Sequence, residues 1–316
     1  MKTFFFIVCT ILIVFSSSAC KKLGNPLILV VLPTSDNPYW QDMISGIEIE
    51  KRILASKFDI QISTGSADID AQRQIEIMNS FLESKKVSAI IIGPASGKQI
   101  VPTVAKFNNA GIPVIVVDSK LDKNELKRNN AKVDLFIGSK NEDGGKKAAE
   151  IIQSLIGNDR QDVLLIEGSP VHETAIARQN GFMNNSPKAW NIIPKRADWD
   201  KVAANRITRA VIETNIPTAI FAASDEMAMG VIAALKSSNI SEDKWPIIVG
   251  FDATIDGLKA IDEGTMCATI KQNPKKIGQR AVRAAIDLIK GMPGVKGEEY
   301  IEVEVIPPQP TKPQKK

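Results

Sequence analysis

The stretch AIFAASDEMAMGVIAALKSSNISEDKWPIIVGFDATIDGLKAIDEGTMCATIKQNP, from Ala219 to Pro274, repeats one unit: a short apolar run, a polar tip and an amphipathic helix. In the first unit Ser224 is a good helix N-cap, and the acidic residues after it suit the positive end of a helix. In the second unit the apolar run ends in Asp252. Short apolar runs that alternate with helices predict a parallel sheet covered on both faces. Because ligands bind at the carboxyl ends of such strands, we expect Ser224, Asp225 and Asp252 to meet at one edge.

The same alternation continues through the rest of the chain. Amphipathic helical patterns separate apolar runs typical of buried strands, which lie at 27–32, 58–64, 88–93, 113–118, 133–138, 163–168 and 191–195. A length of 316 residues, of which 44% are hydrophobic, is enough for two cores. The sequence therefore predicts an α/β protein with two similar lobes, each a parallel sheet flanked by helices.

Residues 1–20 have the layout of an export signal. Lys2 supplies a positive charge, and the apolar run that follows it is shorter than the ~20 residues that span a bilayer. Small residues directly before Cys20 resemble a bacterial lipoprotein signal, in which Cys20 carries the lipid and residues 21–26 form a tether. The alternative is an ordinary secretory signal that is cut after Ala19.

Composition and motifs argue against several classes of protein. Lys plus Arg number 40 and Asp plus Glu 36, a balance that does not indicate a nucleic-acid partner. His172 is the only histidine, and the chain has neither a nucleophile elbow nor a magnesium-type phosphate loop. Asp68 and Asp70 are interpreted as acids at a helix start rather than as metal ligands, and Cys267 as a small buried hydrophobe. We therefore expect no enzymatic activity, no cofactor, no metal and no disulfide.

Aromatic residues make up only 5% of the chain, yet several lie at predicted strand ends. Asn37 is a good N-cap for the helix that opens with Tyr39 and Trp40, and Trp199 lies between two aspartates. Asp118 ends the fourth apolar run. Aromatic rings can bury the C–H faces of a sugar while carboxylates accept its hydroxyl groups. This combination favours a polyhydroxy ligand.

The segments FAASDEMAMG, VGFDATIDG and ATIKQNPKKIG resemble those of bacterial periplasmic sugar-binding proteins of the ribose-binding type, the type I solute-binding family. The resemblance extends from about Leu27 to about Val303. It implies that the chain crosses between the lobes three times and that the lobes close by a hinge. We accordingly expect a first lobe at 27–138 plus 273–294, a second lobe at 139–272 plus 295–306, and a flexible tail at 307–316.

The resemblance also implies which residues contact the ligand. Together with the residues at strand ends, the expected binding set is Asn37, Tyr39, Trp40, Asp118, Ser119, Arg178, Trp199, Ser224, Asp225, Asp252 and Gln272, with Gln272 at the hinge. Two positions depart from the family pattern, since Ser119 replaces an arginine and Ser224 replaces an asparagine. Shorter side chains would leave hydroxyl groups of a ribose ring without partners, so we expect ribose not to be the best ligand.

These inferences give an expected function. We expect an exported monomer in the periplasm or cell envelope, anchored by lipid at Cys20, that captures a small neutral polyhydroxy ligand and delivers it to a membrane ABC permease. The alternative is a receptor role, in which the closed form signals to a membrane sensor kinase or chemoreceptor. A repressor of the same fold would need a helix-turn-helix before Leu27, where the leader lies.

Overall fold

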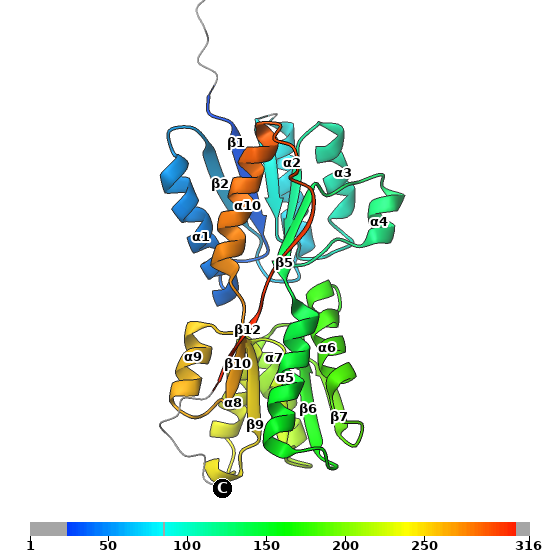
Figure 1. Ribbon diagram of the computed structural model, residues 1–316, viewed down its shortest axis with the longest axis vertical. Helices are drawn as coiled ribbons and strands as arrows, with labels where there is room; N and C mark the ends of the chain where they lie inside the picture. Colours follow the sequence, from blue (N-terminus) through cyan, green and yellow to red (C-terminus); the bar gives the residue numbers. More distant parts are fainter. Residues whose placement is uncertain (1–23, 85, 308–316) are drawn as a thin grey trace, which may run out of the picture.

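The computed structural model describes residues 24–84 and 86–307, which form two α/β lobes stacked end to end (Figure 1). The predicted signal and lipidation site at Cys20, part of the tether and most of the tail lie outside the described residues. Each lobe contains one six-stranded sheet with helices on both faces. The fold predicted from the alternation of strands and helices is confirmed.

The sheet of the first lobe has the order β11-β5-β4-β3-β1-β2, and all its strand pairs are parallel. Its strands are β1 (Leu27–Leu32), β2 (Asp59–Thr64), β3 (Val87–Ile92), β4 (Val114–Val117), β5 (Leu135–Ser139) and β11 (Gly297–Ile301). Its helices are α1 (Pro38–Leu54), α2 (Ala71–Glu83), α3 (Val101–Asn109), α4 (Lys123–Arg128) and α10 (Pro274–Ile289).

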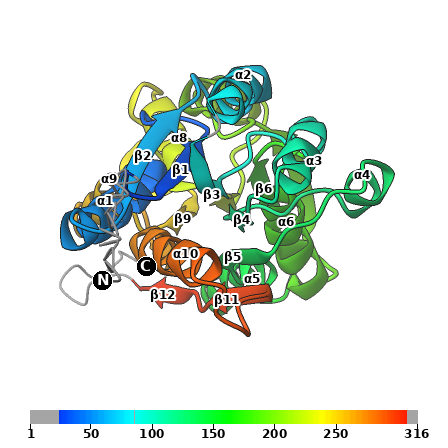
Figure 2. The same ribbon diagram turned by 90° about the horizontal axis from the view of Figure 1, so that it is seen from above.

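Strand β1 shows why both faces of this sheet are covered. Because successive side chains of a strand point to opposite faces, Ile28, Val30 and Leu32 pack with α1 and α10, whereas Leu29 and Val31 pack with α2 and α3. Figure 2 shows α1 and α10 on one side of the strands and α2 and α3 on the other. All five of these side chains are fully buried, which explains the unbroken apolar run in the sequence.

The sheet of the second lobe has the order β12-β10-β9-β8-β6-β7, and only the β10–β12 pair is antiparallel. Its strands are β6 (Asp162–Glu167), β7 (Asn191–Arg196), β8 (Ala219–Ala222), β9 (Ile247–Asp252), β10 (Ala268–Lys271) and β12 (Glu304–Ile306). The α-helices are α5 (Asn141–Ile156), α6 (Glu173–Asn185), α7 (Lys201–Ile212), α8 (Asp225–Lys236) and α9 (Ile255–Asp262). A short 3-10 helix, η1 (Glu242–Lys244), precedes β9.

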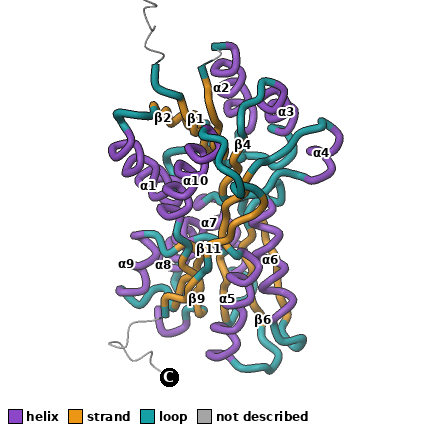
Figure 3. The backbone as a smooth tube through the Cα atoms, turned by 45° about the horizontal axis from the view of Figure 1, so that its top comes forward, coloured by secondary structure: helices purple, strands orange, loops and turns teal. Residues whose placement is uncertain are grey.

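The chain crosses between the lobes three times, after β5, after β10 and between β11 and β12 (Figures 1 and 3). One predicted boundary is wrong, because residues 297–301 form β11 in the first sheet and only β12 returns to the second. Strand β11 adds to the edge of β5, where Glu299 lies opposite Ile137. An ion pair between Glu299 and Arg280 of α10 holds it there. The segment GEEYI is polar and exposed, so no apolar pattern in the sequence indicates this edge strand.

The parallel order directs the carboxyl ends of both sheets toward the junction of the lobes. Loops that follow β1, β2 and β4 in the first lobe therefore face loops that follow β6, β7, β8 and β9 in the second. Within the described part of the chain, no helix is long and apolar enough to cross a membrane.

Candidate functional site

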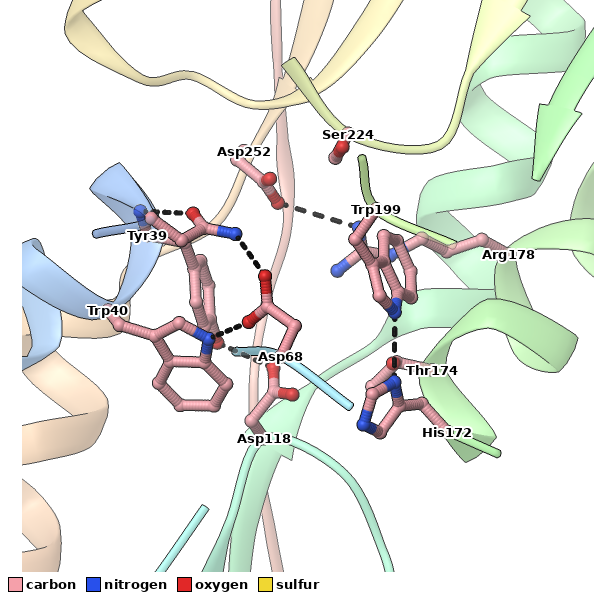
Figure 4. A pocket seen from close by; sticks show the side chains of 11 residues that line it. Tyr39, Trp40, Asp68, Asp118, His172, Thr174, Arg178, Trp199, Ser224 and Asp252 are labelled. Carbon is pink, nitrogen blue, oxygen red and sulfur yellow. Dashed lines mark hydrogen bonds and ion pairs between the residues drawn. The ribbon is translucent and has the colours of Figure 1, made fainter. Parts of the chain in front are cut away.

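A cavity lies between the lobes at these facing strand ends (Figure 4). Its volume is about 40 Å³, several times the ~10–15 Å³ that one water molecule needs, so only a small ligand fits inside this closed form. Its lining comes from both lobes: Asn37, Tyr39, Trp40, Asp68, Asp118, His172, Thr174, Arg178, Trp199, Ser224 and Asp252. Eight of the eleven predicted binding residues are among these, all except Ser119, Asp225 and Gln272.

Tyr39 and Asp118 form one wall of the cavity. Tyr39 is at the start of α1, and its hydroxyl donates to Oδ1 of Asp118 over 2.7 Å. Burial raises the pKa of Asp118 to about 6, although the Tyr39 hydrogen bond and the charge of Arg178 act in the opposite direction. Among the described residues, Tyr39 is the one that donates to this carboxylate, so its second oxygen is an acceptor for a ligand.

Asp68 is a site residue that the sequence interpretation missed. Asp70 caps α2 by accepting from the main-chain N–H of Arg73, as expected for an acid at a helix start. Asp68 instead lines the cavity, where it accepts from Nε1 of Trp40 at 2.6 Å and from Nδ2 of Asn37 at 3.1 Å. It therefore holds the aromatic and the amide in place. In the sequence, Asp68 and Asp70 suit a helix start equally well. The position of Asp68 shortly after a strand end could have indicated that it lies at the cavity.

Arg178 is held rigidly in the opposite wall. Its Nε donates to Oδ1 of Asn141 at 2.8 Å and its Nη1 to the carbonyl oxygen of Ala223 at 2.5 Å. The guanidinium carbon lies 3.8 Å from the centre of the Phe251 ring. The side chain is almost completely buried, and its Nη1 also forms an ion pair with Oδ1 of Asp252 at 3.5 Å. A guanidinium fixed in this way is a preorganised donor for ligand hydroxyl groups.

Trp199 forms the aromatic wall of the second lobe. It follows Asp198, and both residues have positive φ, 54° and 70°, in a loop after β7. Its ring lies against Gly168, where an added Cβ would fall 2.2 Å from the indole, so glycine is required for this close approach. Nε1 of Trp199 donates to Nδ1 of His172 over 2.8 Å, and burial lowers the pKa of His172, which favours the neutral acceptor form.

His172 and Thr174 also line the cavity, although sequence reasoning did not assign them to it. They lie at the entrance to α6, on the segment that leads to Arg178. The loop after β6 thus contributes more residues to the cavity lining than the sequence predicted. Proximity to a strand end and to a predicted ligand arginine was the available signal.

Asp252 ends β9 and is supported by Gln272. Nε2 of Gln272 donates to Oδ1 of Asp252 over 2.6 Å, but Gln272 itself does not line the cavity. Burial raises the pKa of Asp252 to about 7, against the opposing effects of Arg178 and of this hydrogen bond. Gln272 directly follows β10 at one of the crossings between the lobes, so it orients the carboxylate from the hinge.

Ser119 and Asp225 correct two further expectations. Oγ of Ser119 accepts from the main-chain N–H of Glu173 in the other lobe at 3.0 Å, so this hydroxyl joins the lobes rather than facing the cavity. Asp225 is fully buried and accepts from Thr254 and Thr269 instead. Both follow strand ends as predicted, but their side chains turn toward protein partners. Ser224 does line the cavity and also caps α8 by accepting from the N–H of Met227.

The geometry combines aromatic faces with hydrogen-bonding edges. In Figure 4, Tyr39 and Trp40 lie on one side of the cavity, and Trp199 and Arg178 lie on the other. Carboxylate oxygens accept, the guanidinium donates, and hydroxyl groups of a ligand can do both. No group of His, Cys, Asp or Glu side chains within residues 24–84 and 86–307 is arranged to hold a metal ion.

Relatives and solved structures of this fold are known. The D-allose-binding periplasmic protein of Escherichia coli K12 is 33% identical over 83% of this chain and 84% of its own length. The ribose import binding protein of Bacillus subtilis 168 is 28% identical over 82% of this chain and 80% of its own length.

Two solved structures show the same fold. A solute-binding protein of an ABC transporter from Actinobacillus succinogenes, with bound D-allose, has a TM-score of 0.81 and 24% identity over 90% of this chain and 98% of the other. Another from Bacillus halodurans, with bound myo-inositol, has a TM-score of 0.79 and 24% identity over 90% of this chain and 95% of the other. Residues 28–293 match the family described as the periplasmic binding protein domain. This chain belongs to the periplasmic binding protein family.

Proposed function

We propose that this protein captures a small neutral polyhydroxy ligand, a monosaccharide or cyclitol, in the cavity between its lobes and delivers it to an ABC importer. The observation that carries the proposal is the cavity itself, which both lobes line and which pairs aromatic rings with carboxylates and one rigid guanidinium. The ligand is enclosed when the lobes close by the hinge, and the closed surface is what the permease binds.

The cavity suits hydroxyl groups better than other ligand chemistry. Asp118 and Asp252 offer acceptors and Arg178 offers donors, while Trp40 and Trp199 offer flat apolar surfaces. A hydroxyl group can donate to a carboxylate and accept from a guanidinium at once, so neighbouring hydroxyls on a ring satisfy both. Each buried polar group left without a partner costs about 1–3 kcal/mol, which makes the fit selective.

The relatives support an importer rather than a receptor. Those named above are described as binding proteins for D-allose and for ribose import, and the solved structures as components of ABC transporters. These descriptions support transport over signalling as the role of this site, and binding over catalysis. We propose further that the mature protein is a periplasmic monomer tethered through lipid on Cys20.

Calorimetry and uptake together test the proposal. Purified protein is titrated with D-allose, D-ribose, myo-inositol and a charged control such as D-glucuronate, and uptake of the tightest binder is measured in cells with and without the gene. We expect a neutral sugar or cyclitol to bind with micromolar or better affinity and uptake to require the gene. Trp199→Ala, which removes an aromatic wall, is expected to abolish binding, whereas Trp245→Ala, at a position outside the cavity lining, keeps it. Undiminished uptake in the deletion strain would contradict the importer role.

A further inference from the structure

Asp225 is a buried acid that the binding site does not use directly. It is the first residue of α8, is fully buried and does not line the cavity. Its Oδ1 accepts from Oγ1 of Thr269 at 2.7 Å, and its Oδ2 accepts from the main-chain N–H of Thr254 at 2.8 Å and from Oγ1 of Thr254 at 3.2 Å. All three donors belong to segments that flank Asp252, the cavity carboxylate.

The turn after Asp252 has an unusual backbone. Asp252 and Ala253 have φ values of 109° and 56°, a region that residues with side chains rarely adopt unless the surroundings hold them there. The N–H of Ala253 donates to Oγ1 of Thr269 at 3.3 Å, and that hydroxyl in turn donates to Asp225. The main-chain N–H of Thr254 therefore donates to Asp225 directly, and the N–H of Ala253 is linked to Asp225 through the Thr269 hydroxyl.

The fold leaves a closed socket for this carboxylate. A Cβ on Gly250 of β9 would fall 2.2 Å from Oδ1 of Asp225, and a Cβ on Gly257 of α9 would fall 2.1 Å from Oδ2. Only glycine fits at either position. Burial raises the pKa of Asp225 to about 8, and the charge of Asp252 acts in the same direction, whereas the hydrogen bonds from Thr269 and Thr254 act against them.

We propose that Asp225 is a positioning residue that sets the affinity and selectivity of the site by holding Asp252 in the orientation that faces the ligand. The inference rests on the proposed function, in which Asp252 binds the ligand. Gln272 and Arg178 orient the Asp252 carboxylate, at 2.6 and 3.5 Å, and the main-chain N–H of Gln272 donates to the Asp252 carbonyl oxygen at 3.4 Å, but neither supports the two amides that follow Asp252. Asp225 and Thr269 supply that support, so losing them releases Asp252 while leaving the rest of the cavity wall in place.

A double-mutant cycle tests the inference. The probe is whichever of D-allose, D-ribose and myo-inositol raises the unfolding temperature of the wild type most, together with its monodeoxy derivatives. We expect Asp225→Asn to weaken binding by roughly tenfold or more when Asp252 is present, because the N–H₂ group of asparagine cannot accept from the donors that now meet a carboxyl oxygen. Beside Asp252→Ala the same change should have little further effect. The deoxy series should show that the same hydroxyl loses its contribution in Asp225→Asn and in Asp252→Ala.

Thr269 supplies a matched control. Thr269→Val removes the relaying hydroxyl at nearly constant volume and is expected to weaken binding in the same pattern, whereas Thr269→Ser keeps the hydroxyl and stays close to wild type. This pair decides the matter if Asp225→Asn fails to fold.

Two results overturn the inference. One is that Asp225→Asn lowers affinity by the same factor whether or not Asp252 is present; the other is that it weakens the contribution of every ligand hydroxyl equally. A wild type that none of the three probes stabilises contradicts the proposed function itself, and the inference then loses its basis.

Discussion

Oγ of Ser119 in the first lobe accepts a 3.0 Å hydrogen bond from the main-chain N–H of Glu173 in the second. A second hydrogen bond also joins the two lobes, from the main-chain N–H of Gly97 to the carbonyl oxygen of Val171. Ser119 is fully buried, and its hydroxyl makes a contact between the lobes instead of the expected contact with the ligand. On this side of the cavity, the closed arrangement of the lobes is therefore stabilised by hydrogen bonds within the protein rather than by contacts with the ligand.

Ser119→Ala should weaken binding of every ligand by a similar factor. The loss of one buried hydrogen bond in the closed form is worth about 1 kcal/mol, or roughly fivefold in affinity. Calorimetry with two different sugars measures the effect, and the order of their affinities is expected to stay unchanged. A change in that order would mean that Ser119 contacts the ligand after all.

The same geometry predicts the effect of an arginine at position 119. Ser119 has no exposed surface, so the larger side chain in Ser119→Arg should push the lobes apart rather than reach a ribose hydroxyl. We expect weaker binding of all sugars and a larger radius of gyration by small-angle scattering at saturating ligand. Ser224→Asn, at a position that does line the cavity, is the matched variant and should alter selectivity without this expansion.

Asp68→Asn tests the acid that sequence reasoning did not place in the site. An amide keeps one acceptor but turns an N–H₂ group toward Asn37 or Trp40, so one of the two bonds is lost. We expect affinity to fall by roughly ten- to a hundredfold, in line with about 1.5–3 kcal/mol for a hydrogen bond to a charged group. Asp70→Asn, two residues along, is the control. It removes a charge from an exposed N-cap and should leave affinity unchanged.

Gly168→Ala tests whether the position of Trp199 determines binding. The added methyl group would lie 2.2 Å from the indole ring, so the ring must move out of the cavity wall. Binding should fall by an order of magnitude or more, and the tryptophan emission of the free protein should shift toward that of an exposed indole. Gly24→Ala, where nothing lies within 4 Å of the added group, should match the wild type in both measurements.

The contrast between predicted and observed features has a physical cause. Periodicity along the chain predicts strands such as β1, because five buried apolar side chains in a row leave a clear pattern. It also places Asp118 and Asp252 at the rim, because strand ends follow from strand positions. It does not show which of two adjacent residues at a strand end faces the cavity. Ser224 lines the cavity, whereas the neighbouring Asp225 is buried among protein donors. Nor does it show contacts between lobes, such as Ser119 with Glu173, or polar edge strands such as β11.

The buried carboxylates predict how stability of the free protein depends on pH. Burial raises the pKa of Asp118 to about 6, of Asp252 to about 7 and of Asp225 to about 8, each above the ordinary value of about 3.8 for an exposed aspartate. Between about pH 4 and pH 8 the folded chain therefore binds more protons than the unfolded chain, so these groups make stability fall as pH rises. Each contributes up to about 1.4 kcal/mol per pH unit within its own window.

The unfolding temperature of the ligand-free protein should accordingly be higher at pH 5.5 than at pH 8. Asp225→Asn removes one ionisable group and should make this dependence shallower, most clearly as the pH approaches 8, where Asp118 and most of Asp252 are already ionised. Calorimetric scans in buffers of matched ionic strength measure both effects. A ligand whose hydroxyl groups donate to Asp118 and Asp252 stabilises their ionised forms and should reduce the loss at pH 8. Stability of the free protein that does not fall between pH 5.5 and 8 would mean that these carboxylates are ionised throughout this range.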